Sequence, residues 1–187
     1  MSFSRLFYVA LSIVALWLAY HLVNQHKETR IQVAPNLELP IFSGAHLDNV
    51  SYDQNGLRRY VITSQHLDYY AKSGNTTFEY PMLKIYQQGT QLEWEITAKR
   101  GILTHDQVLI LYDDVSMNNL LEESGFDRLT TAQLSIELNN RDFWTDSEVT
   151  LSGALFTTRG QAMKGNFSDH SALLYHSVQG YYETLTP

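Results

Sequence analysis

The chain of 187 residues contains no cysteine, which excludes disulfide bonds, thiol catalysis and thiolate metal sites. Positive charge is also scarce, with 13 Lys and Arg against 20 Asp and Glu. The chain therefore lacks the general attraction to phosphate that most nucleic-acid-binding proteins show. Its seven histidines are scattered and form no HxH or HExxH pair, so we expect no metal site.

Motifs of catalysis are missing as well. The sequence has no GxxxxGK[ST] phosphate loop and no GxSxG motif. The acidic pairs Asp113-Asp114 and Glu122-Glu123 are expected at strand ends or in loops, where solvated charge is ordinary. We expect a protein that is not an enzyme, that needs no cofactor and that takes any driving energy from another protein.

The amino-terminal part carries one long apolar segment. Residues 6–23 contain no Asp, Glu, Lys or Arg, and as a helix they would span about 27 Å, close to the thickness of a bilayer core. A cleaved signal peptide is the alternative, but no pair of small residues marks a cleavage site near its end. The sequence predicts a transmembrane helix over 6–23, with residues 1–5 in the cytoplasm and the rest of the chain outside it.

The remainder of the chain is predicted to be all-β. Residues 24–44 show no period and read as a tether, whereas 45–187 are rich in strand-forming aromatic residues and in turn signals. Over residues 92–98, Leu, Trp, Ile and Ala alternate with Glu93, Glu95 and Thr97, the pattern of a half-buried strand with its glutamates outward. Residues 108–112 are apolar on both faces, and the pattern leaves open which face points inward.

A strand-turn-strand unit recurs along this part. Ala98 is followed 17 residues later by Val115, Ala132 by Val149, and Gln161 by Val178. Repeats of this kind bury an apolar face by stacking on their neighbours, and the two end strands of such a stack stay unpaired. The prediction is an antiparallel β-jellyroll or an open stack of hairpins. Its apolar side is either an ordinary core or a groove for an apolar ligand.

Six segments cover much of the chain behind the one-helix amino terminus. They are "SQHLDYY" (64–70), "YPMLKIY" (80–86), "WEITAKRGILTHD" (94–106), "VLILYDDVSMNNL" (108–120), "LTTAQLSIEL" (129–138) and "VTLSGALFTTRGQAMKGNF" (149–167). In this order, along almost the whole chain, they resemble the LptC family, the single-span periplasmic subunits of the lipopolysaccharide export machine.

The resemblance implies an LptA/OstA-like jellyroll in the periplasm, anchored in the inner membrane, whose interior holds the acyl chains of lipopolysaccharide. Its partners would be the permease subunits, the ATPase complex and the periplasmic bridge protein LptA. An adaptor that docks partners through its strand edges without binding lipid is the alternative.

Site residues follow from the same resemblance. The inward apolar positions implied to contact lipid are Ile62, Phe78, Leu83, Trp94, Ile96, Leu111, Leu134, Ile136, Val149, Leu151, Phe156, Met163 and Phe167. The edge facing the permease would include His46, Leu47, Val50 and Tyr52, and the edge facing the bridge protein Leu173, Tyr175, Val178 and Tyr182.

Overall fold

The computed structural model describes residues 17, 38–121 and 125–183. The predicted membrane helix lies outside the described residues except for Trp17, which is helical. Within the described ranges, no helix is both long enough and apolar enough to cross a membrane. Residues 1–37 and Glu38–Pro187 form separate units, and everything below concerns the second unit.

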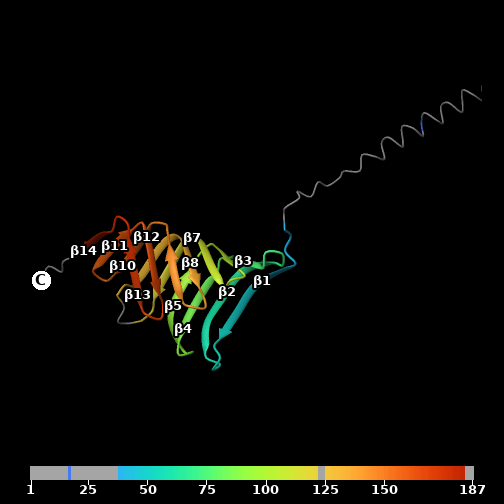
Figure 1. Ribbon diagram of the computed structural model, residues 1–187, viewed down its shortest axis with the longest axis horizontal. Coiled ribbons are helices and arrows are strands. Elements are labelled where there is room, and N and C mark those ends of the chain that lie inside the picture. The colour runs from blue at the N-terminus through green and yellow to red at the C-terminus, as the bar shows by residue number, and fades with distance from the viewer. Residues whose placement is uncertain (1–16, 18–37, 122–124, 184–187) are drawn as a thin grey trace, which may run out of the picture. The chain divides into compact units, whose positions relative to one another are not determined.

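The second unit is all-β, as the sequence predicts, and its strands form one antiparallel sheet (Figure 1). In Figure 1 the first strand lies at one end of the sheet and the last two lie at the other. The first strand begins at Phe42, slightly before the boundary expected at residue 45. The fourteen strands are β1 (Phe42–Tyr52), β2 (Arg58–Tyr70), β3 (Asn75–Glu79), β4 (Met82–Gln87), β5 (Gln91–Thr97), β6 (Arg100–Leu103), β7 (Val108–Asn119), β8 (Arg128–Glu137), β9 (Asp142–Thr145), β10 (Val149–Gly153), β11 (Phe156–Gly160), β12 (Ala162–Asn166), β13 (Ser171–Tyr175) and β14 (Gln179–Tyr182).

The pairing divides the sheet into two walls that share their long strands. One half of β2 pairs with β3 and the other half with β4; β7 divides in the same way between β6 and β5, and β8 between β9 and β10. We call the wall of β3, β6, β9, β12 and β13 wall A, and the wall of β4, β5, β10, β11 and β14 wall B. The strands β1, β2, β7 and β8 run through both walls and join them.

The recurring unit of the sequence is a segment that crosses from one wall to the other, as one continuous strand in β7 and β8 and as two successive strands in β3–β4, β5–β6 and β9–β10. Pro81, Ala98, Val115, Ala132 and Val149 follow one another at intervals of 17 residues, and each lies at or beside the line where the walls meet. Backbone hydrogen bonds join neighbouring segments along this line. For example, the amide of residue 98 donates to the carbonyl oxygen of residue 81 at 3.2 Å. The sequence marks this line in each crossing segment, and the turns lie at the far ends of the walls.

The bend in β7 corrects one expectation. Asp113 and Asp114 do not end a strand; they lie inside β7, with φ of 62° and 52°, at a bulge in its pairing with β8. His176 and Ser177 have the same conformation between β13 and β14. Aspartate tolerates this left-handed region better than most side chains, and a bulge bends the strand that carries it.

The core lies between the two walls and answers the open question on residues 108–112. Leu109 and Leu111 are fully buried and point inward, whereas Val108, Ile110 and Tyr112 are partly exposed on the outer face. The same parity continues into β8, where Leu134 and Ile136 are buried.

Candidate functional site

The predicted lipid-facing positions lie together between the walls. All of them are buried except Phe156, which is partly buried and packs against the core. Ile62, Leu83, Trp94 and Ile96 come from the wall B side, and Leu111, Leu134 and Ile136 from wall A. The sequence pattern thus brings its apolar positions to one shared interior, and burial alone leaves open whether they bind lipid.

Aromatic side chains fill this interior near its carboxy-terminal half. The ring of Phe167 lies 5.4 Å from that of Trp94 and 4.6 Å from that of Phe143, measured between centroids. Trp94 also packs against Phe126, at 5.7 Å. Because Trp94 belongs to β5 and Phe143 to β9, these contacts join wall B to wall A, and the space between the walls is occupied by the protein's own side chains.

Two arginines close the interior at the free ends of the walls. Arg59, at the start of β2 on the wall B side, donates to the backbone oxygens of Leu138 (2.8 Å) and Asn139 (3.0 Å) at the end of wall A. Arg141, in the turn after β8, donates in the opposite direction to the backbone oxygen of Tyr86 (2.7 Å). We call this region, where the free ends of the two walls meet, the mouth.

Electrostatics at the mouth are set by partial burial. Burial lowers the pKa of Arg141, and nearby Arg59 lowers it further, while the Glu93 carboxylate raises it. The recess beneath the two arginines has a volume of about 10 Å³, room for about one water molecule. The mouth is therefore closed.

The orientation of Glu93 was predicted wrongly. It does not face solvent: its side chain is 1% exposed, and its carboxylate forms an ion pair with His170. The cause is a bulge in β5, where Tyr86 pairs with Leu92 and Ile85 pairs with Trp94, which leaves Glu93 without an opposite residue. A bulge of this kind redirects a side chain to the other face of the sheet.

The predicted edge residues lie on strands with one free side, except Val178, which lies between β13 and β14. Within the described ranges, β1 pairs with β2 alone, β13 with β12 alone and β14 with β11 alone. Val50 and Tyr52 are exposed on β1, as are Leu173 on β13 and Tyr182 on β14. His46 and Val178 are also exposed, and Leu47 and Tyr175 are partly buried.

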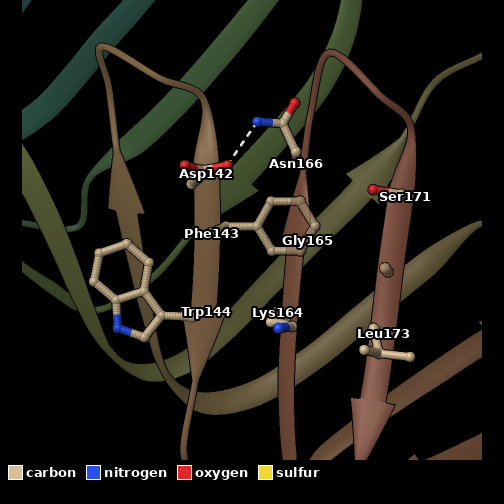
Figure 2. A pocket seen from close by; sticks show the side chains of 9 residues that line it. Asp142, Phe143, Trp144, Lys164, Gly165, Asn166, Ser171 and Leu173 are labelled. Atoms are coloured by element: carbon tan, nitrogen blue, oxygen red, sulfur yellow. Dashed lines mark hydrogen bonds between the residues drawn. The ribbon is translucent and has the colours of Figure 1, made fainter.

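A hollow of about 700 Å³ lies over β9, β12 and β13, next to the β13 edge (Figure 2). Trp144, Lys164 and Leu173 are register partners and so share one face of wall A. Figure 2 shows the ring of Phe143 lying over Gly165, with Asp142 accepting a 2.7 Å hydrogen bond from the amide of Asn166. In the part of the chain that the structure describes, no group of three or more His, Cys, Asp or Glu side chains could hold a metal ion.

Sequence reasoning missed the mouth altogether. Arg59 and Arg141 lie at strand boundaries, where charged residues are ordinary, and their partners are far away in the sequence. Glu93 was missed because period-2 alternation places it on the outer face, and the bulge in β5 is seen only in the pairing with β4.

Comparison with known proteins gives one family. The family model described as lipopolysaccharide-assembly, LptC-related, matches residues 8–183. The lipopolysaccharide export system protein LptC of Escherichia coli K12 is 31% identical over 157 residues, which cover 84% of this chain and 82% of that protein. The protein of the same name from Haemophilus influenzae is 23% identical over 196 aligned positions, which cover 94% of this chain and 93% of the relative.

Proposed function

Because the chain belongs to the LptC family and is a non-enzymatic component of the lipopolysaccharide export system, we propose that its interior receives the acyl chains of lipopolysaccharide. The chain takes them from the permease and ATPase complex and passes them to the periplasmic bridge protein LptA. The observation that carries the proposal is the continuous row of buried apolar side chains that both walls direct at one another, from Ile62 near the first strand to Met163 near the last.

The physical need for such an interior follows from the cost of exposing acyl chains to water. Each methylene that leaves an apolar environment costs about 0.8 kcal/mol, so a lipid with several long chains faces tens of kcal/mol. An apolar passage lowers that cost without a covalent step. In this design the sugar and phosphate parts of the lipid stay outside in water and need no basic surface, which agrees with the excess of acidic over basic residues in the chain.

Edge strands supply the second half of the proposal. Free N–H and C=O groups on an edge pair with the edge of another sheet, which extends the sheet across a protein boundary. We assign the β1 edge to the permease and the edges of β13 and β14 to the bridge protein. The apolar segment 6–23 holds the chain in the inner membrane, with the sheet in the periplasm.

An adaptor without bound lipid is the second candidate, and the filled interior favours it. The side chains of Trp94, Phe143 and Phe167 occupy the space between the walls, and the arginines close its mouth. In this alternative the interior is a core, and the edges alone carry the function.

Photo-crosslinking at two adjacent residues separates the candidates. Leu134 is fully buried between the walls and Gln133 is exposed on the outer face, so a crosslinking side chain at each samples opposite sides of one strand. Lipid transport predicts that position 134 captures lipopolysaccharide in cells and that position 133 does not. Equal capture at both positions, or capture at neither in a chain that supports growth, favours the adaptor.

A further inference from the structure

We propose that Arg59, Glu93, Arg141 and His170 form a clasp that holds the two walls together at the mouth, and that lipid enters the interior when this clasp releases. The inference rests on the proposed function for its lipid step alone. The clasp itself is a property of the protein free of lipopolysaccharide and is tested without that ligand.

Each member of the clasp connects one wall to the other. Arg59 reaches from the β2 end of wall B to the backbone at the end of β8, and Arg141 reaches from the turn after β8 to β4. Glu93 on β5 pairs with His170 in the turn between β12 and β13. These side chains come from four segments of the chain and meet across one gap.

The carboxylate of Glu93 is the least expected member. A carboxylate with 1% exposure is strongly disfavoured unless charged or hydrogen-bonding partners surround it. The bulge in β5 is what turns it inward, next to Arg141 and His170. A core built for stability alone has no use for a charge here, whereas a closure that must separate does, because water solvates the charge once the walls part.

The arginines are held by partners that are easily exchanged. Their described hydrogen bonds go to neutral oxygens: the backbone oxygens of Tyr86, Leu138 and Asn139, and the hydroxyl of Ser168 at 3.5 Å. Hydrogen bonds from a guanidinium to a neutral carbonyl are weaker than those to a carboxylate or phosphate. Release therefore exchanges these bonds for bonds to water or to acidic groups of the entering ligand.

The closed state also leaves a polar atom of the clasp unsatisfied. Among the described residues, Glu93 Oε2 is buried and has no hydrogen-bond partner, and the same holds for Ser64 Oγ, Trp94 Nε1 and Ser116 Oγ outside the clasp. A buried carboxylate oxygen without a hydrogen-bond partner is rare in native structures and calls for an explanation. An interior that alternates between closed and open supplies one for Glu93, because its Oε2 gains water as a partner when the mouth opens.

Opening is required by volume. The recess at the mouth holds about 10 Å³, and carbon atoms in contact lie about 3.5–4.0 Å apart, so even one acyl chain needs the walls to separate by at least that distance. Wall A and wall B are joined covalently along β2, β7 and β8, which leaves the clasped ends as the place where separation occurs.

Pulsed electron paramagnetic resonance on the full-length chain in phospholipid nanodiscs tests the clasp. The absence of cysteine allows two labels to be placed uniquely. Thr90→Cys with Asn140→Cys puts exposed labels in the end turns of walls B and A, and Asp106→Cys with Asn140→Cys puts both on wall A. Without lipopolysaccharide, Glu93→Gln is expected to lengthen and broaden the first distance and to leave the second unchanged.

The matched control is Glu95→Gln, which removes the same charge two residues away. Glu95 lies on the outer face and pairs with Lys84 at 3.9 Å, so the Glu95→Gln substitution is expected to leave the distance between the labels across the mouth unchanged. If Glu93→Gln also leaves that distance unchanged, the clasp is overturned, whatever the protein binds.

The lipid step has its own outcome. In the labelled chain that keeps Glu93, purified rough-type lipopolysaccharide should lengthen the distance between the labels across the mouth by at least the width of one acyl chain. An unchanged distance, in a sample where a crosslinker at Leu134 captures the lipid, overturns the release step and leaves the proposed function intact. Failure of that capture contradicts the proposed function and leaves the result for Glu93→Gln as it stands.

Discussion

At the scale of single residues, Gly165 is the position where the structure leaves least room. A Cβ atom there would lie 2.3 Å from Cζ of Phe143 and 2.3 Å from the backbone oxygen of Ser171. Because residue 165 has no side chain, the ring of Phe143 can pack directly over it in the interior. For the same reason, β13 can pair with β12 without a clash at the backbone oxygen of Ser171.

Gly165→Ala is therefore expected to lower the free energy of unfolding by about 1–3 kcal/mol, the usual cost of overpacking a filled core. Urea denaturation followed by circular dichroism measures it. Gly125→Ala is the control, because a Cβ at this exposed glycine meets nothing within 4 Å and the change should stay within about 0.5 kcal/mol. Equal effects of the two substitutions would contradict the close packing described at Gly165.

Single residues also show how far the sequence predicts the site. The inward set, such as Leu83 and Leu134, follows from alternation, because a half-buried strand must place its apolar residues on one face. The orientation of Glu93 was predicted wrongly because one bulge interrupts the alternation of inward and outward side chains in β5. Asp113 and Asp114 were also predicted wrongly, because acidic pairs usually end strands, whereas here they bend one.

At the scale of elements, the terminal strands differ from the others in having one side unpaired in the described structure. The β13 edge carries Leu173, with 57% of its surface exposed, next to the hollow over β9 and β12. An exposed leucine on a free edge adds apolar contact to the backbone pairing that a partner strand would form. The edge is thus the element at which a change should affect partner binding more than stability.

Because we propose that the β13 edge docks the bridge protein LptA, we expect Leu173→Asp to raise the dissociation constant of that complex about tenfold or more, equivalent to about 1.4 kcal/mol. Surface plasmon resonance with the full-length chain measures it. Leu57→Asp introduces the same charge at a leucine that is 44% exposed in the turn between β1 and β2, which is not part of the β13 or β14 edge, and it should leave the affinity unchanged. A smaller loss at position 173 than at position 57 would place the partner elsewhere.

Elements were predicted better than their connections. The predicted turn signals at 53–56, 72–75, 88–89 and 139–142 each overlap a turn in the structure, although residue 75 begins β3 and residue 142 begins β9. The division of β2, β7 and β8 between two walls was not predicted, because a strand that bends without a break keeps the same period-2 pattern on both sides of the bend. The 17-residue spacing contained this information, but it was interpreted as a strand-turn-strand unit.

At the scale of the whole sheet unit, closure of the interior depends on contacts between distant parts of the chain. Arg59 binds backbone oxygens 79 and 80 residues further on. Such contacts leave no local pattern, so the sequence predicts an apolar interior without predicting whether it is open. The structure shows it closed, and a lipid passage through it requires the walls to move.

The three tryptophans give the most direct measurement of whether acyl chains enter. Trp94 is 2% exposed between the walls, whereas Trp144 lies partly exposed on the outer face of wall A. A full-length chain with Trp17→Phe and Trp144→Phe reports on the interior alone, and one with Trp17→Phe and Trp94→Phe reports on the outer face.

Both chains, in nanodiscs of unlabelled phospholipid, are titrated with lipopolysaccharide that carries a nitroxide quencher on an acyl chain. Entry of the acyl chains predicts saturable quenching of Trp94 and little quenching of Trp144. Equal quenching of the two tryptophans, or quenching of Trp144 alone, would contradict a lipid passage between the walls.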